Sequence, residues 1–392
     1  MTGSRPLIVV YGARGVVGDA VVRQLVAGGS VAIALAGRSG VGLTAMHAEL
    51  ARAGVPVQLR VAARDDAEGL TTLCAGAAVV IDASSAPTAA AHDPMILAAL
   101  GAGAHYLDAR SAATWARGAY EQHDRLARAR GAVVCTGVGV EGALGDWLAA
   151  VTAAALVSGQ VHRGDIADDD LEPTPVDGLA TVVAYDDLTV SPGAQQSLGK
   201  LGGADGFRWR DGRWEPQALG AERRRFDVGG TRGVRLALCW PGAEVVTTPR
   251  HVAASAITTY RSFSTDDLGA GLAVSVARLA GPLARLGFGK RGGVLDQVMV
   301  APTGGAAARA RTTFVVQAEA TLGAERRVAR LTGRDPSATT GTLLALAAQH
   351  LARRTLGPVG ALAPAEWWPA AEALVSIAAA AGLALSPPAA AG

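Results

Sequence analysis

The chain has very few lysines and cysteines for its 392 residues. Only two lysines are present, Lys200 in a glycine-rich stretch and Lys290 in a basic one, and neither is placed like a catalytic lysine. The three cysteines, Cys74, Cys135 and Cys239, are too far apart in the sequence to give a metal-ligand spacing. We therefore expect no metal site, and we interpret Cys74 and Cys135 as buried free thiols.

The sequence also lacks a long hydrophobic run. No apolar segment reaches the length of about 18 to 20 residues that spans a bilayer, and Trp147–Val157 and Leu374–Leu385 are short enough to be core helices. The apolar stretch Leu268–Phe288 carries Arg278 and Arg285 and could rest on a membrane surface. We favour its packing on its own protein.

Charge of either sign is not in large excess, since the formal net charge is +2. This balance gives no broad basic surface for nucleic acid, so a small molecule is the expected partner. The N-terminus runs directly into the first predicted strand and leaves no room for a signal peptide. We expect a cytoplasmic protein of about two domains.

Residues 1–140 alternate between apolar runs and helical patterns, as in a doubly wound parallel sheet of the Rossmann type. Gly28, Gly29 and Gly54 are expected to end the first two helices. The predicted strands are Leu7–Tyr11, Val31–Ala36, Val57–Ala62, Val79–Asp82, His105–Leu107 and Ala132–Thr136, and the predicted helices are Val17–Ala27, Gly42–Ala53, Asp66–Leu73, Pro94–Gly101 and Ala113–Arg130.

The remaining residues indicate a second, α+β domain over 141–335 with a mostly antiparallel sheet, followed by C-terminal helices in 336–392 that pack back on the Rossmann domain. Such a sheet with one open face favours a symmetric partner, so we expect a homodimer. The predicted strands are Leu179–Tyr185, Val234–Trp240, Glu244–Thr248, Ser255–Ser262, Val294–Ala301 and Arg311–Thr321, the last pairing with Arg326–Leu331 across Gly323, and the predicted helices are Thr340–Arg354 and Ala370–Ala381.

A glycine-rich turn follows the first predicted strand at once. Gly12 permits a tight turn, Gly15 lets the backbone approach a pyrophosphate, and Gly18 lets helix and strand pack closely. The diphosphate of a dinucleotide would lie on the helix N-terminus. The expected cofactor-binding residues of this loop are Gly12, Ala13, Arg14, Gly15, Val16, Val17 and Gly18.

The end of the second predicted strand distinguishes the two nicotinamide cofactors. NAD-binding folds place an acidic residue there for the ribose hydroxyls, whereas this chain has Gly37, Arg38 and Ser39. The guanidinium of Arg38, with that of Arg14, suits the 2′-phosphate of NADP(H). The alternative is that Arg38 is a solvated residue at a strand end.

Further cofactor contacts are expected at other strand ends. The small residues after the fourth strand, Ser84, Ser85, Ala86 and Pro87, would flank the ribose on the nicotinamide side, or would only form a turn. Arg64 and Asp65, after the third strand, could approach the adenine.

A reductase also needs a proton donor near the nicotinamide. We select Tyr106, Asp108 and His123 from the first domain and Arg250 from the second, where Arg250 would suit a substrate carboxylate. Asp108 could instead cap the following helix, and His123 and Arg250 could be surface residues. Further candidates are His92, Tyr120, His251, Tyr260 and Arg261.

Several segments together resemble the saccharopine dehydrogenase-like oxidoreductases, which include the trans-acting enoyl reductases of actinobacteria. They are the glycine loop with Ala36-Gly37-Arg38, then His105-Tyr106-Leu107-Asp108, the segment Gly137–Asp146, and Gly333-Arg334-Asp335-Pro336 with the turn Gly357–Pro364. The resemblance implies that Gly137 and Gly139 contact the cofactor.

The resemblance further implies an NADPH-dependent reductase of a C=N, C=C or C=O bond, with bacterial specialised metabolism as a setting. The chain departs from the family at Arg110-Ser111, where a Gly-Glu pair is usual, and at Val140, Glu141 and Leu144. These departures leave open a non-catalytic NADP-binding sensor or scaffold.

Overall fold

A computed structural model describes residues 5–84, 93–161, 175–190, 206–263 and 303–390. It divides the chain into two compact units. The first unit comprises Met1–Ser111, Trp115–Gly139 and Ser337–Leu362, and the second comprises Ala112–Thr114, Val140–Pro336 and Ala363–Gly392. Each unit is described separately.

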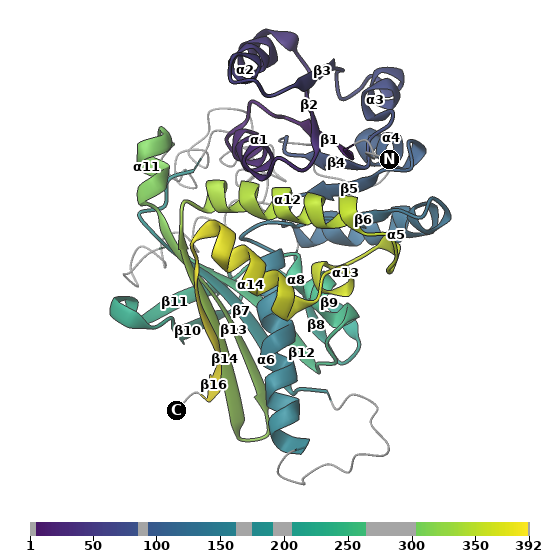
Figure 1. The fold of residues 1–392 in the computed structure, drawn as a ribbon. Coiled ribbons are helices and arrows are strands. Elements are labelled where there is room, and N and C mark those ends of the chain that lie inside the picture. The colour runs from purple at the N-terminus through teal and green to yellow at the C-terminus, as the bar shows by residue number, and fades with distance from the viewer. Residues whose placement is uncertain (1–4, 85–92, 162–174, 191–205, 264–302, 391–392) are drawn as a thin grey trace, which may run out of the picture. The chain divides into compact units, whose positions relative to one another are not determined.

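The first unit is built on a seven-stranded sheet in the order β15-β6-β5-β4-β1-β2-β3, in which every neighbouring pair is parallel (Figure 1). This is the predicted doubly wound Rossmann sheet, and the strand order reverses between β1 and β4. The strands are β1 (Leu7–Tyr11), β2 (Ala32–Gly37), β3 (Val57–Val61), β4 (Val79–Asp82), β5 (His105–Asp108), β6 (Val133–Cys135) and β15 (Gly360–Ala361).

The helices of this unit begin and end close to their predicted positions. Gly29 caps the C-terminus of helix α1 in the left-handed conformation, and the buried Val21, Val22 and Leu25 form the side of the helix that faces the core. The helices are α1 (Val16–Gly28), α2 (Gly40–Arg52), α3 (Ala67–Cys74), α4 (Pro94–Gly101), α5 (Ala113–Ala129) and α12 (Pro336–Arg353).

The second unit contains a mixed sheet in the order β10-β11-β12-β7-β13-β14-β16, with the β8–β9 hairpin attached to β12. Its pairs are antiparallel except β7 with β12, which confirms the predicted α+β class. The strands are β7 (Gly178–Asp186), β8 (Gly206–Arg210), β9 (Arg213–Gln217), β10 (Arg223–Asp227), β11 (Val234–Cys239), β12 (Ala256–Ser262), β13 (Thr313–Leu322), β14 (Glu325–Arg334) and β16 (Ala384–Ala390).

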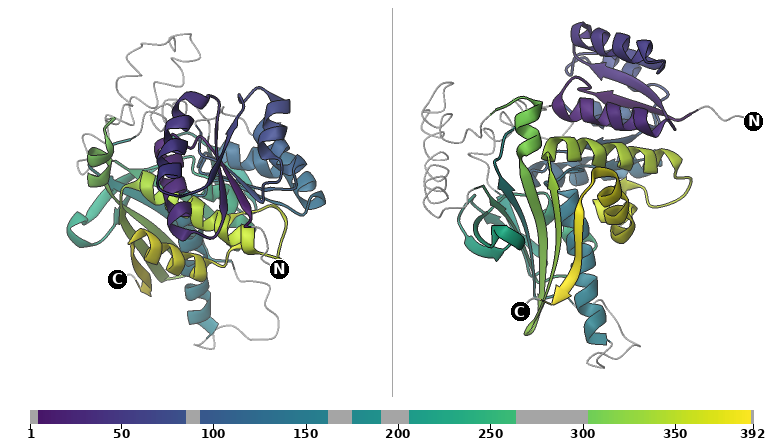
Figure 2. Two further views of the ribbon diagram at one scale, coloured as in Figure 1. Left: turned by 45° about the horizontal axis from the view of Figure 1, so that its top comes forward. Right: turned by 60° about the vertical axis from the view of Figure 1, so that its left-hand side comes forward.

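Helices cover one face of this sheet. The long helix α6 packs against β13 and β14, and α14 packs against α6 (Figure 2). The helices of the unit are α6 (Ala143–Val161), α8 (Glu244–Thr247), the 3₁₀ helix η2 (Thr248–Arg250), α11 (Ala306–Arg311), α13 (Pro364–Trp367) and α14 (Ala370–Ala381).

On its other face the sheet is curved, so that side chains of distant strands meet. Arg224 on β10 forms an ion pair with Glu319 on β13, and Arg330 on β14 donates to the carbonyl of Asp227 on β10 at 2.9 Å. Strands that are far apart in the sheet order therefore meet. Small and aromatic side chains fill the interior, and they are Ala180, Val182, Ala184, Phe226, Val228, Ala237, Cys239, Tyr260 and Val315.

One strand prediction in this unit is wrong. Glu244–Thr248 was expected to be a strand, because β-branched residues are concentrated there, but Glu244–Thr247 forms helix α8. Burial of Val245 and Val246 and hydrogen bonds from the hydroxyls of Thr247 and Thr248 to Asp146 override the local preference. The predicted strand Val294–Ala301 and the stretch Leu268–Phe288 lie outside the described residues.

The C-terminal residues differ from the expectation that all of 336–392 packs on the Rossmann domain. Only 337–362 belong to the first unit, whereas α13, α14 and β16 belong to the second. The sequence concealed β16, because Pro387 and Pro388 argue against a strand. An edge position with a register irregularity opposite Val328 and Arg330 accommodates them.

Two further absences concern only the part of the chain that the structure describes. None of its helices is long and apolar enough to cross a membrane. No group of three or more histidine, cysteine or acidic side chains could hold a metal ion there.

Candidate functional site

The glycine loop has the geometry that its sequence predicts. Gly12 has a φ of +81°, and a Cβ there would lie 2.9 Å from the amide nitrogen of Ser84. A Cβ on Gly18 would lie 2.2 Å from the carbonyl oxygen of Gly12, so helix α1 can approach the loop only at a glycine. A Cβ on Gly15 would lie 3.2 Å from that same oxygen. The backbone forms a cradle that side chains would fill, and this cradle fits a dinucleotide diphosphate.

Two exposed arginines lie with the loop and the N-terminus of α2. Arg14 donates to the carbonyl of Gly42 at 3.2 Å, which fixes its guanidinium beside the first turn of α2. Arg38 immediately precedes Ser39, the N-cap of that helix, whose hydroxyl accepts from the amide of Val41. Unpaired amides and two guanidinium groups make this a site for a phosphate monoester, which fits the 2′-phosphate of NADP.

The ends of strands β3 and β4 are joined by a buried ion-pair network. Asp82, at the end of β4, is paired with Arg64 at 2.5 Å and with Arg110 at 2.7 Å. Arg64 also pairs with Asp93, the N-cap of α4, at 2.7 Å. Although burial alone would raise the pKa of Asp82, the guanidinium groups of Arg110 and Arg64 hold it well below its usual range. Asp82 is therefore a fixed anion, and its Oδ1 accepts from the amide and the hydroxyl of Ser84.

Asp108, at the end of β5, is surrounded by donors. Its Oδ2 accepts from Arg110 at 2.7 Å, from Trp115 at 2.9 Å and from the Tyr106 hydroxyl at 3.0 Å. Its Oδ1 accepts from the Thr136 hydroxyl at 2.6 Å and from the amide of Arg110 at 2.9 Å. These bonds tie the ends of β5 and β6 together, and Asp108 caps the turn at Arg110 rather than helix α5.

These contacts bear on two of the residues selected as proton donors. Tyr106 is fully buried, accepts from Arg110 at 2.7 Å, and has its pKa raised well above the ordinary value by burial. Asp108 is fully buried among its donors. The structure brings Tyr106 and Asp108 together, but in an arrangement typical of a structural network. Arg64 belongs to the same network through its pair with Asp82.

The other selected donors lie elsewhere. His123 is 1% exposed on the inner side of α5, so the alternative that it is a surface residue is wrong. Arg250 is in the second unit, where it pairs with Glu366 at 2.7 Å. Arg250 is therefore more than a solvated surface residue, because its guanidinium joins η2 to α13.

The remaining predicted cofactor residues fall into two groups. Gly137 has a φ of +73° and its amide lies 3.4 Å from Oδ1 of Asp108, while a Cβ on Gly139 would lie 3.1 Å from Cγ2 of Thr340. Asp65 is exposed after β3. Ser85, Ala86 and Pro87, together with His92, lie outside the described residues.

The second unit contains two polar clusters that residue-by-residue reasoning missed. In the first cluster, Asp146 accepts from Thr247 at 2.7 Å and Thr248 at 3.0 Å, and it lies 2.9 Å from Nε2 of His251. The amide of Ala365 completes the set at 3.2 Å. Two sequence indications pointed to members of this cluster: Asp146 lies in the segment that resembles the family, and His251 is among the further candidates.

The second cluster surrounds Arg261, which is completely buried. Its guanidinium lies 3.5 Å from Glu244 and 4.0 Å from Glu141, and Glu141 accepts from the Tyr185 hydroxyl at 2.5 Å. Burial raises the pKa of Glu244 despite the opposing charge of Arg261. No motif connects these four residues, so their proximity could not be predicted from the sequence.

The Asp146–His251 pair predicts a pH-dependent stability. Burial works against the charged imidazole, but Asp146 outweighs it and raises the pKa of His251. The stabilisation is therefore complete below the unfolded pKa of about 6.5 and is lost as the pH rises through the folded pKa. We expect His251→Gln to lower the free energy of unfolding more at about pH 5 than at about pH 9, measured by urea denaturation. His47→Gln, on α2, is the control, and an equal deficit at both pH values would contradict the pairing.

Comparison with known proteins supports the NADP site. Residues 8–135 match the family model described as the saccharopine dehydrogenase NADP binding domain. No curated protein matches the chain. The cofactor that the domain binds is therefore NADP, in agreement with the prediction from Arg38.

Solved structures resemble the chain only weakly. Pen from Bacillus thuringiensis is 10% identical with a TM-score of 0.27, over 41% of this chain and 57% of that one, so the chain spans little more than half of its length. GenD2 from gentamicin A biosynthesis, in complex with NAD, is 14% identical with a TM-score of 0.40, over 98% and 97% of the two chains. An oxidoreductase from Pseudomonas syringae is 11% identical with a TM-score of 0.39, over 89% and 86%.

The family match, the glycine cradle and the parallel sheet agree over the same part of the chain. They identify residues 8–135 as an NADP-binding domain. Over these residues the chain matches the NADP binding domain of the saccharopine dehydrogenases.

Proposed function

We propose that the protein is an NADPH-dependent reductase that acts on a C=N, C=C or C=O bond of a small organic molecule. The single observation that supports this most is the pair Arg14 and Arg38 beside the N-terminus of α2, which favours the phosphorylated cofactor. Bound NADPH would supply the hydride, and the protein would orient it and supply a proton. Bacterial specialised metabolism in the cytoplasm is the proposed setting.

In this proposal the cofactor is held by the residues selected from the sequence. The glycine loop Gly12–Gly18 holds the diphosphate, and Arg14, Arg38 and Ser39 hold the 2′-phosphate. Ser84, which Asp82 fixes through two hydrogen bonds, borders the ribose on the nicotinamide side. Asp82, Tyr106 and Asp108 support this edge of the sheet.

Tyr106, Asp108 and His123 remain proposals from the sequence, and in the second unit we propose that His251 can hold and donate a proton. Its side chain is 12% exposed, and Asp146 at 2.9 Å raises its pKa, so a larger share of the imidazole is protonated near neutral pH. Asp146 would orient the ring through Nε2, which leaves Nδ1 to donate. We propose that Arg250, the neighbouring residue, binds Glu366 on α13 rather than a substrate carboxylate.

The 2′-phosphate assignment predicts a cofactor-specific loss of affinity. A charge-assisted hydrogen bond contributes about 1.5–3 kcal/mol, so Arg38→Gln should weaken NADPH binding by roughly 10- to 100-fold. NADH binding should change little, because NADH lacks the 2′-phosphate. Titration of cofactor fluorescence measures both affinities. Arg52→Gln, at the far end of α2, is the matched control, and equal losses for NADPH and NADH would contradict the assignment.

The second candidate function is an NADP-binding sensor or scaffold without catalysis, favoured by the departures at Arg110-Ser111 and Glu141. The two functions are separated by following NADPH oxidation with a panel of cyclic imines, enones and ketones. A reductase should oxidise NADPH with at least one class. NADPH binding without turnover of any class would favour the sensor.

We also propose that the protein is a homodimer. The sequence predicted a homodimer from an open face on the sheet of the second domain. Among the described residues, side chains of β10, β13 and β14 instead close that face over their own core. A surface on the first unit supplies a better reason.

A further inference from the structure

Strand β3 forms one edge of the seven-stranded sheet, and Figure 1 shows no described element of the first unit beyond it. The amide of Ala62 donates to Gly37 on β2 at 3.1 Å. Because backbone groups alternate in direction along a strand, the amides and carbonyls of Val57, Leu59 and Val61 point away from β2. Within the described part of the chain, this edge therefore carries backbone groups that no other strand pairs with.

The usual protection of an edge strand is absent from β3 apart from its short length. It contains no proline, and its one charged side chain, the half-buried Arg60, donates to the carbonyls of Leu73 at 2.6 Å and Ala75 at 2.8 Å. Leu59 is 39% exposed and Val61 is 50% exposed. The edge is thus apolar as well as unpaired.

The exposed apolar surface extends onto α2. Val41, in the first turn of this helix, is 88% exposed, and the preceding Gly40 lies against Val61, since a Cβ there would be 3.7 Å from its Cγ2. Val41, Leu59 and Val61 are three of the eight large hydrophobic residues that are exposed among the described ones. We call these three residues with the free edge of β3 the edge patch.

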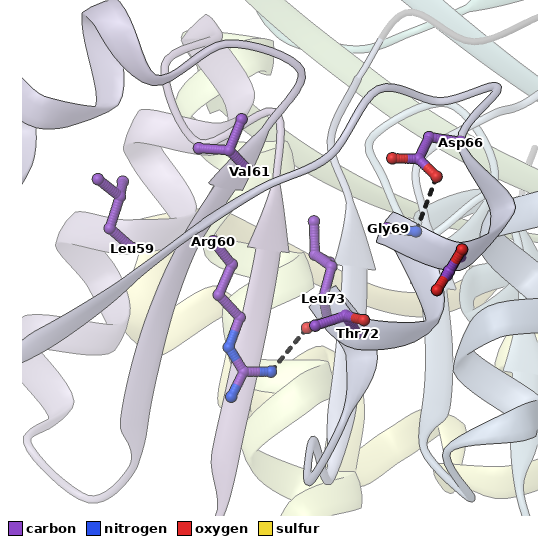
Figure 3. A pocket seen from close by; sticks show the side chains of 8 residues that line it. Leu59, Arg60, Val61, Asp66, Gly69, Thr72 and Leu73 are labelled. Atoms are coloured by element: carbon purple, nitrogen blue, oxygen red, sulfur yellow. Dashed lines mark hydrogen bonds between the residues drawn. The ribbon is translucent and has the colours of Figure 1, made fainter.

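A groove runs beside the same strand. It has a volume of about 620 Å³ and lies between β3 and α3, lined by Leu59, Arg60 and Val61 on one side (Figure 3). Leu73, Glu68 and the N-cap residue Asp66 line the other side. The groove thus carries charges of both signs next to apolar side chains, which suits a partner with the same mixture.

We propose that the edge patch binds a second copy of this chain through antiparallel pairing of the two β3 strands. With the symmetry axis at Leu59, Val57 lies opposite the partner's Val61 and Gln58 lies opposite the partner's Arg60. Leu59 lies opposite the partner's Leu59. Apolar residues thus meet apolar ones, polar residues meet polar ones, and the outward backbone groups form about six hydrogen bonds.

The symmetry of this pattern favours a second copy over an unrelated strand. The five residues Val57–Val61 alternate in the same way in both directions, so the strand is complementary to itself in the antiparallel register. The basic Arg60 and the carboxylates of Asp66 and Glu68 line one groove, so two copies match in charge as well. The inference rests on the proposed homodimer and is independent of the proposed reductase activity.

The test is the oligomeric state of the full chain, measured by light scattering coupled to size exclusion over a range of concentrations. The wild type should be a dimer, and Leu59→Lys should raise the dissociation constant by about tenfold or more, because it places like charges opposite each other. Val375→Lys, at a 64% exposed position on α14, is the matched control and should remain dimeric. Circular dichroism verifies that both variants are folded.

A second variant gives positive evidence. Leu59→Cys should be linked into a dimer by a short thiol-reactive cross-linker, and Val375→Cys should not, since Cys74, Cys135 and Cys239 are buried. A wild type that is monomeric at all concentrations would overturn the proposal. So would a dimer that persists in Leu59→Lys and that the reagent fails to link through Leu59→Cys.

Discussion

Arg110→Met is expected to lower the free energy of unfolding by about 3–5 kcal/mol, the cost typical of breaking a buried ion pair. The Arg110 side chain is 14% exposed, and its guanidinium lies 2.7 Å from both Asp82 and Asp108, whose side chains are completely buried. Methionine would keep much of the side-chain volume but leave two buried carboxylates without their shared cation. Urea denaturation at neutral pH measures the loss.

The pH dependence identifies the cause of that loss. Because the folded pKa of Asp82 is depressed, its stabilisation is present above the unfolded value of about 3.9 and is lost as the pH falls through the folded pKa. The deficit of Arg110→Met should therefore be complete at neutral pH and shrink only in acid.

A matched control separates the network from the general cost of losing an arginine. Arg117→Met breaks the pair of Arg117 with Glu121 on the surface of α5. Exposed pairs of this kind contribute about 0.3–0.5 kcal/mol. Similar deficits in Arg110→Met and Arg117→Met would show that the network contributes little.

Gly18→Ala is expected to abolish tight NADPH binding and to destabilise the first unit by about 1–3 kcal/mol, as overpacking does. The added Cβ would lie 2.2 Å from the carbonyl oxygen of Gly12 and 2.9 Å from the Cα of Ala13. Both atoms belong to the main chain, so no side-chain rotation relieves the overlap. Helix α1 must move away from β1, and the loop then loses the shape that fits a diphosphate.

The measurements for Gly18→Ala are thermal unfolding and an NADPH titration. Gly101→Ala is the matched control, because Gly101 ends α4 and a Cβ there would meet nothing within 4 Å. That variant should bind NADPH normally and be as stable as the wild type or slightly more so. Retained affinity in Gly18→Ala would show that the loop tolerates a shifted helix.

The sequence predicted the first unit well because its elements are determined by local features. The apolar runs of Leu7–Tyr11 and Val79–Asp82 have the exact strand bounds, and Pro94 together with the cap Asp93 sets the start of α4. The spacing of Gly12 and Gly18 predicted the positions where another part of the main chain leaves no room for a Cβ. These features act within a few residues, so they are visible without a fold.

The second unit was harder to predict, and so were the roles of its polar residues. The hydroxyls that Thr247 and Thr248 turn toward Asp146 come from residues about 100 positions away, and Arg261 meets Glu141 and Glu244 from three separate segments. Nothing in the local sequence distinguishes such residues from surface ones. For the same reason the sequence suggested Tyr106 and Asp108 as proton donors, and their hydrogen bonds with Arg110 became visible only in the structure.

By itself the sequence determined the cofactor, because the glycine loop and Arg38 act on the ligand through backbone geometry and charge at fixed positions along the chain. Only the tertiary structure decided which acidic and basic side chains neutralise each other, and which strand edge is left unpaired. Those outcomes depend on groups that are distant in sequence and on how completely folding removes them from water.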